Sequence, residues 1–222
     1  MDIITGILAT AVLAGGVLAL AALGEVLAER VGVFNLGVEG LMALGGVTGI
    51  IAVTIIPNPF FGFAMALIVG LVFGAIFALA TVTFRANQVL CGLALTMLGS
   101  GLAVTVGKPY SGMPAKAQFD KVIIPYLSDL PILGRALFSQ NILVYLIYLI
   151  IPAVISFVLF RTRHGMNVRA VGENPAAADS AGIPVTLIRF TYVTIGAALG
   201  AGAGAYLTLA FVPSWSDGVV AG

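Results

Sequence analysis

Asn35 and Glu39 lie four residues apart in the segment GVFNLGVEGLMALGG (residues 32–46), which is otherwise apolar or glycine. An ionisable side chain inside a membrane is costly and usually faces a bundle interior or a water-filled path. Gly32, Gly37 and Gly40 favour a break in the helix or a close backbone approach. In a purely structural role, Asn35 would cap a helix, and Glu39 in its first turn would be stabilised by the helix dipole. The segment therefore predicts a helix start that carries polar groups at membrane depth, as in transporter sites.

A second group of residues lies in RTRHGMNVRAVGENPAAADSAGIPV (residues 161–185). Asn174 is a suitable N-cap, Pro175 suits the first helical position, and Gly182 with Pro184 beyond it ends a helix. These signals predict a helix over residues 175–181. A helix of about two turns is not stable alone in water, so it must dock either on the chain's own span ends or on a partner protein.

Other chemistries find no support in the sequence. His164 has neither a second histidine nor a cysteine partner for a metal site, and Cys91 is the only cysteine. The sequence contains no phosphate-binding loop and no serine in a nucleophile elbow. We therefore expect no catalytic residue, no metal and no cofactor in this chain.

The composition is that of a membrane protein. Of the 222 residues, 60% are hydrophobic and only 9% are charged, with a mean hydropathy of +1.14, whereas soluble domains carry about 25% charged residues. The formal net charge of +1 gives no reason to expect nucleic-acid binding. Apolar stretches of about 20 residues can cross a bilayer as helices. We predict an all-α polytopic protein with six spans, at residues 3–23, 33–56, 60–84, 89–106, 142–160 and 188–212.

Basic residues predict the orientation of these spans. Six arginines fall in three connections that alternating spans place on one side: Arg30, Arg85, and the group Arg161, Arg163, Arg169 and Arg189; the opposite loop carries four basic residues, Lys108, Lys116, Lys121 and Arg135. The positive-inside rule makes that side the cytoplasm, so the N-terminus lies outside.

The N-terminal segment lacks a basic region and is interpreted as the first span, not as a cleaved signal peptide. Residues 107–140 then form an irregular external loop with one short helix. In the sixth span, the spacing of Gly196, Gly200 and Gly204 predicts close helix packing.

Three segments together resemble a known family: GEVLAERVGVFNLGVEGLMALGG, VGENPAAADSAGIPV and GAGAGAYLTLAFVPSW. They are similar to the permease subunits of bacterial ABC importers, in the branch for nucleosides and related simple sugars, alongside ribose and branched-chain amino-acid permeases. The resemblance implies a multi-pass protein of the bacterial inner membrane. It also implies a second, related permease subunit, two ATPase subunits that hold ATP and magnesium, and an external substrate-binding protein.

The resemblance also assigns residues to roles within one permease domain, residues 1–222. The stretch with Asn35, Gly37, Glu39 and Gly40 resembles the family's discontinuous second helix beside the translocation path. The cytoplasmic loop 161–187 would hold the coupling helix that fits a cleft on the ATPase. The residues assigned to that contact are Gly172, Asn174, Ala177, Ala178, Gly182 and Ile183. Because family members usually continue for two or more further spans, either the last segment is unusually bare or this domain is incomplete at its C-terminal end.

One alternative stays open from the sequence. A secondary transporter or channel could use Glu39 as a proton or ion site. Such a protein needs no cytoplasmic partner, so the short exposed helix over residues 175–181 counts against it.

Overall fold

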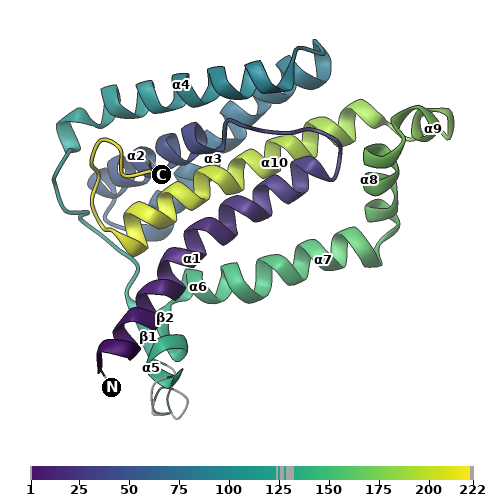
Figure 1. The fold of residues 1–222 in the computed structure, drawn as a ribbon. Coiled ribbons are helices and arrows are strands. Elements are labelled where there is room, and N and C mark those ends of the chain that lie inside the picture. The colour runs from purple at the N-terminus through teal and green to yellow at the C-terminus, as the bar shows by residue number, and fades with distance from the viewer. Residues whose placement is uncertain (1, 124, 126–127, 129–132, 221–222) are drawn as a thin grey trace.

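The computed structural model describes residues 2–123, 125, 128 and 133–220 (Figure 1). Within these residues, six helices are long and apolar enough to cross a membrane, which confirms the predicted all-α polytopic class. The helices are α1 (Asp2–Glu29), α2 (Val38–Ile55), α3 (Pro59–Ala78), α4 (Gln88–Gly107), α5 (Leu133–Phe138), α6 (Ile142–Tyr145), α7 (Ile151–Arg161), α8 (Arg163–Glu173), α9 (Pro175–Ser180) and α10 (Val185–Tyr206). The strands β1 (Lys121–Ile123) and β2 (Ser139–Asn141) form one short antiparallel pair.

Two span boundaries differ from the prediction in ways that matter for the site. The first helix continues past residue 23 to Glu29, because residues 24–29 are mostly good helix formers and a helix need not end with the apolar run. The second helix begins at Val38, not at Val33. The backbone N–H groups of Phe34 and Asn35 donate to side chains of other elements and so take no part in a helix.

The centre of the bundle is built from α2 and α10, with α10 packed against α1, α2 and α3 (Figure 1). A Cβ atom at Gly204 would overlap the Met42 carbonyl of α2, and one at Gly196 would overlap the Gly24 carbonyl of α1. At Gly200 the nearest atom would be 3.8 Å away, an ordinary contact. The predicted close packing is therefore confirmed at Gly196 and Gly204 and is not required at Gly200.

Three spans contain a π-helical turn: η1 (Leu79–Thr83) extends α3, η3 (Leu146–Ile150) joins α6 to α7, and η4 (Leu207–Phe211) extends α10. The η3 turn has a local cause in Pro152. Proline lacks an N–H and its ring clashes with the carbonyl four residues earlier, and a wider turn relieves both effects. The span from Ile142 to Arg161 thus stays continuous.

The predicted loop 107–140 is more ordered than expected where it is described. It contains the 3₁₀ turn η2 (Lys108–Tyr110), β1, and α5 as its short helix; residues 124, 126–127 and 129–132 of this region lie outside the described residues. Trp215, from the segment after η4, is buried here, and its carbonyl accepts a hydrogen bond from the Gly112 N–H at 2.8 Å. This region closes the end of the bundle that also holds the N-terminus (Figure 1).

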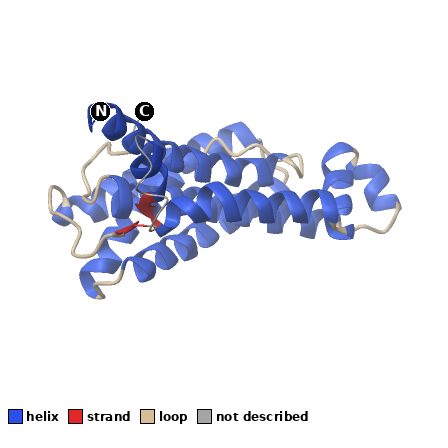
Figure 2. Cartoon of the chain, turned by 90° about the horizontal axis from the view of Figure 1, so that it is seen from below, coloured by secondary structure: helices blue, strands red, loops and turns tan. Residues whose placement is uncertain are grey.

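The opposite end holds the arginine-rich connections. It comprises the end of α1, the α3–α4 turn with Arg85, and the α8–α9 segment, which projects beyond the long helices (Figures 1 and 2). Contacts tie these connections together: Arg189 Nε donates to the Val31 carbonyl at 3.0 Å, and Gly172 packs on the Arg30 carbonyl. The predicted grouping of these six arginines at one end is confirmed, while α5, which contains Arg135, lies at the other end.

Candidate functional site

A turn followed by an extended segment connects α1 to α2. Gly32 adopts φ +78°, and its N–H and that of Val33 donate to carbonyls of the last turn of α1. Glycine accommodates this left-handed conformation without strain from a Cβ atom. The chain then runs without regular secondary structure over residues 33–35 before two turn residues lead into α2. The connection therefore doubles back into the bundle instead of passing over its end (Figure 1).

Contacts with α4 give the depth of this re-entrant segment, which we define as residues 33–37. The Phe34 N–H donates to Gln88 Oε1 at 2.9 Å, at the first residue of α4. Gly40, in the first turn of α2, lies against the backbone of Leu95 and Thr96. With a rise of 1.5 Å per residue, α2 begins roughly 10 Å further along α4 than its first residue. The second span is thus preceded by non-helical backbone at membrane depth.

Such backbone must find hydrogen-bond partners within the protein. The Asn35 N–H donates to Glu25 Oε1 at 2.8 Å, and the Gly37 N–H donates to Asn35 Oδ1 at 2.9 Å. The Leu36 carbonyl accepts from Thr96 Oγ1 at 2.9 Å. Side chains from α1 and α4 therefore replace the missing helical hydrogen bonds.

The structure contradicts the predicted role of Asn35 as a helix cap but places Glu39 as predicted. Asn35 is 4% exposed and is not the N-cap of α2: that position is Gly37, and Asn35 forms a local turn just before it. The cap interpretation was wrong because it assumed that the helix began two residues earlier. Glu39 does lie in the first turn, as predicted, and its side chain is exposed on the bundle surface.

Sequence reasoning missed the side chains that hold the re-entrant segment. Glu25 was placed outside the first span, although a carboxylate in GEVLAERVG (residues 24–32), beside a membrane run, was a signal for it. Gln88 and Thr96 carried no comparable signal, because single polar residues are common near the ends and packed faces of membrane helices. Only the three-dimensional contacts identify them.

The short helix over residues 175–181 is confirmed as α9, with the predicted caps. Asn174 Oδ1 accepts from the Ala177 N–H at 3.0 Å, and Pro175 occupies the first turn. At the other end Gly182 has φ +79°, and the Ile183 N–H donates to the Ala178 carbonyl at 3.0 Å. This pattern is a glycine-based C-cap that satisfies the last carbonyls of a helix.

The residues assigned to the coupling contact divide into three groups by exposure. Asn174, Ala177 and Gly182 are exposed. Ala178 is only 4% exposed, since it packs with Val171 and Ile188 in the chain's own core. The remaining two, Gly172 and Ile183, are half-buried, with Gly172 against the Arg30 carbonyl. Part of the predicted set thus docks α9 on its own chain, as one of the two alternatives expected, and the rest faces outward, where docking on a partner stays a prediction.

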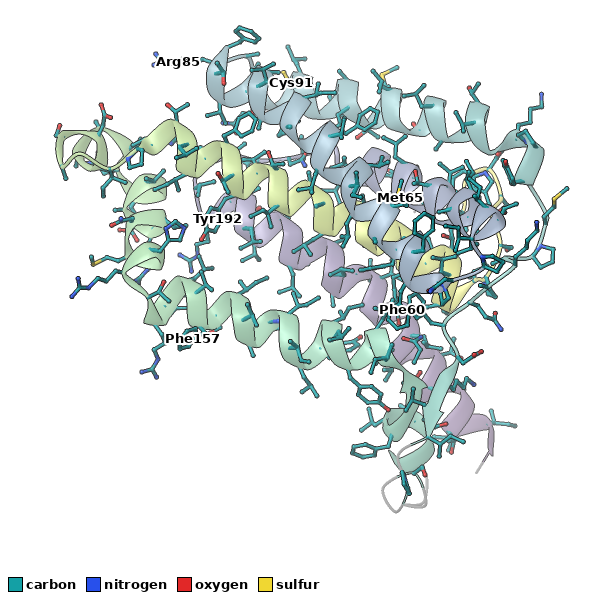
Figure 3. The ribbon with its side chains drawn as sticks, turned by 180° about the vertical axis from the view of Figure 1, so that it is seen from behind. Phe60, Met65, Arg85, Cys91, Phe157 and Tyr192 are labelled. Atoms are coloured by element: carbon teal, nitrogen blue, oxygen red, sulfur yellow. The ribbon has the colours of Figure 1, made fainter. Side chains whose placement is uncertain are left out.

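A polar groove lies beside the outward face of α9. It encloses about 670 Å³ between α9, the α3–α4 turn and the start of α10. Arg85, Arg189 and Asp179 contribute charges, and threonines of η1 contribute hydroxyl groups. Figure 3 shows Arg85 pointing away from the bundle at this turn. The groove can accept a protruding polar segment of a partner.

Among the described residues, no group of three or more histidine, cysteine, aspartate or glutamate side chains is placed to hold a metal ion. The α8–α9 segment contacts the turn at residues 30–32, which leads directly into the re-entrant segment. The two predicted sites are therefore connected through one turn.

Comparison with known proteins identifies the family. The sequence pattern of the family described as branched-chain amino acid transport system / permease component matches residues 7–222. The chain belongs to this family. No solved structure matches the chain.

Relatives of this permease carry more specific names. A protein of Haloferax volcanii named as a candidate glucose ABC transporter permease, TsgC13, is 37% identical over 100% of this chain and 68% of its own length. The guanosine ABC transporter permease protein NupQ of Bacillus subtilis is 36% identical over 85% of the chain and 63% of its own length. The nucleoside ABC transporter permease protein NupC of Lactococcus lactis is 29% identical over 90% and 66%. The chain spans about two thirds of the length of these relatives.

Proposed function

We propose that this chain is a permease subunit of an ATP-binding-cassette importer and that α9 is the helix through which the ATPase drives it. The observation that carries the proposal is α9 itself, in a chain of a permease family. It is short, capped at both ends and fixed to its own bundle through Ala178. Its outward face and the neighbouring groove offer a partner a surface of small and polar groups.

The substrate that we propose is a nucleoside or a related simple sugar. Relatives named for guanosine, nucleosides and glucose support this class. A second, related permease subunit completes the pore, two ATPase subunits bind ATP and magnesium, and an external binding protein delivers the substrate. The chain lies in the inner membrane of a bacterial cell with its N-terminus outside and its arginine-rich end in the cytoplasm.

The re-entrant segment and the first turn of α2 form part of the translocation path in this proposal. A helix that starts inside the membrane presents free N–H groups and a positive dipole end to a polar solute. Asn35, Gly37 and Gly40 shape this start and fix it against α4, while Glu39 supplies an exposed carboxylate. The contact of α8 with the turn at residues 30–32 offers a route from ATPase motion to this segment.

The secondary transporter or channel remains the competing function, with Glu39 as its ion site. Family membership favours the importer, since the ABC permease relatives work as parts of an ABC system by their names. A secondary transporter or channel needs no ATPase, so an exposed surface for coupling to one would have no role in it.

Replacing Ala177 with tryptophan tests the proposal. The bulky ring on the outward face of α9 should weaken ATPase binding by about 30-fold, because disruption at an interface anchor commonly costs 2 kcal/mol or more. Co-purification of the ATPase and substrate-stimulated ATP hydrolysis are the measurements. Ala153→Trp, at an exposed alanine on α7, is the matched control and should leave both unchanged. Ala178→Trp is unsuitable, since that position is buried in this chain.

Intact ATPase binding and substrate uptake in the Ala177→Trp variant would show that α9 is not the docking helix. The secondary-transporter alternative would then take precedence.

A further inference from the structure

Two guanidinium groups lie against one half-exposed aromatic ring where α7 meets α8. The Cζ atoms of Arg30 and Arg169 are each 5.4 Å from the centre of the Phe160 ring. The three residues come from the end of α1, the middle of α8 and the last turn of α7. Cation–π attraction orients both guanidinium groups on this ring, so two positive charges from different helices share one aromatic side chain.

Neither charge is neutralised by this chain. Among the described residues, Arg30 and Arg169 form no ion pair, and Arg169 Nε is buried without an acceptor. Their acidic sequence neighbours Glu29 and Glu173 are exposed and do not contact them. A buried donor without an acceptor and closely spaced positive charges are unfavourable, so an anion from outside the chain would stabilise this pair.

An apolar row leads from the arginine pair along the membrane span. Val154, Phe157 and Phe160 recur at every third position of α7, and each is at least half exposed. Residues three apart lie on neighbouring parts of one helix face. Figure 3 shows Phe157 pointing away from the bundle. The charges thus lie at the end of a span and next to a surface suited to an acyl chain.

We propose that Arg30, Arg169 and Phe160 form a binding site for an anionic phospholipid. The two guanidinium groups bind the phosphate through charge-assisted hydrogen bonds, for which their planar donor arrangement is suited. One acyl chain follows Phe157 and Val154 into the bilayer. A lipid fits better than a free anion because the apolar row continues directly from the charges.

Lipid binding to the purified protein in detergent tests this site. Native mass spectrometry would titrate phosphatidylglycerol and phosphatidylcholine with identical acyl chains. We expect the unaltered protein to retain phosphatidylglycerol preferentially. The R30Q/R169Q variant should bind it about 20-fold more weakly, because it loses both direct, charge-assisted guanidinium contacts to the phosphate and not only two surface charges.

The control removes the same charge elsewhere on this end. R161Q/R163Q changes two exposed arginines that do not contact Phe160 and should keep binding within about threefold. An equal loss in both variants would mean a diffuse surface charge and would overturn the proposal. Displacement of the lipid by inorganic phosphate would overturn it too, since the site would then be one for free anions.

Two further measurements keep the proposal testable if the R30Q/R169Q variant misfolds. The R30K/R169K variant keeps the charges but loses the planar donors, and intermediate binding is expected. The comparison of the two lipids on the unaltered protein needs no substitution. Equal retention of phosphatidylglycerol and phosphatidylcholine there would by itself contradict the site, whatever the ATPase experiments give.

Discussion

Asn35 shows how one polar side chain can replace a turn of helix inside a membrane. Its Oδ1 accepts from Gly37 while its own N–H donates to Glu25, and the residue is almost fully buried. Each of these groups would otherwise be left unpaired where water is scarce. Asn35 therefore stabilises the non-helical backbone before α2, and any role of this residue in transport acts through the position of α2.

Asn35→Ala should destabilise the protein by about 1–3 kcal/mol, because it leaves the buried Gly37 N–H without an acceptor. Asn35→Ser keeps a side-chain oxygen that can accept from the Gly37 N–H without adding a buried charge, and it should retain more of the stability. Thermal unfolding of the two purified variants, followed by loss of monodisperse protein, measures the difference. Equal stability of the alanine variant and the unaltered protein would contradict the hydrogen-bond network.

Glu39 is exposed, so its side chain is available to a passing solute or to a neighbouring subunit. Glu39→Gln should change stability by at most about 1 kcal/mol, the size of a dipole interaction in the first helical turn. We expect assembly to be retained and substrate uptake to be lost. Uptake at the unaltered rate would remove Glu39 from the path.

At the scale of elements, the glycines of α10 decide how closely it approaches α1 and α2. Gly204→Ala should strongly reduce stability, because the new Cβ would overlap the Met42 carbonyl and backbone cannot move aside cheaply. Gly200→Ala is the matched control: it has room for the methyl group, and alanine favours the helix by about 1 kcal/mol. Thermal unfolding of both variants tests this. Similar losses at the two positions would contradict the packing of α10 as described.

The elements differ in how far the sequence could predict them. The spans and α9 follow from local signals, namely apolar length, Asn174 as a cap and Gly182 as a terminator. Helix α8 was missed because Gly165 and Gly172 lower helix propensity. Those glycines are needed for contact with the carbonyls of Val158 and Arg30. The sequence does contain a start signal for α8, which was missed: Thr162 caps the helix by accepting a hydrogen bond from the Gly165 N–H.

The site was less predictable than the helices. The positions of Asn35 and Glu39 could be singled out from their polarity in an apolar run. Their partners could not, because Glu25 and Gln88 meet the re-entrant segment only after the chain folds back. Similarly, the three consecutive alanines of α9, residues 176–178, look alike in sequence, and only packing separates buried Ala178 from exposed Ala177.

At the scale of the whole molecule, the two ends of the helix bundle carry different basic residues. The arginine-rich connections share one end, and Lys116 lies at the other. We expect an impermeant thiol reagent to label Lys116→Cys in intact cells and to leave His164→Cys unlabelled, in a background without Cys91. Permeabilised cells provide the control, where both positions should react. Labelling of position 164 from outside would reverse the orientation.

The central claim is that α9 faces the ATPase, and a crosslink from Ala177 tests it most directly. Ala177→Cys in a background without Cys91 would be combined with the ATPase subunits and a short bifunctional thiol reagent, beside Lys116→Cys as the control at the other end. The account predicts a permease–ATPase adduct from position 177 and none from position 116. An assembled complex in which position 177 gives no adduct, or position 116 gives one, would contradict it.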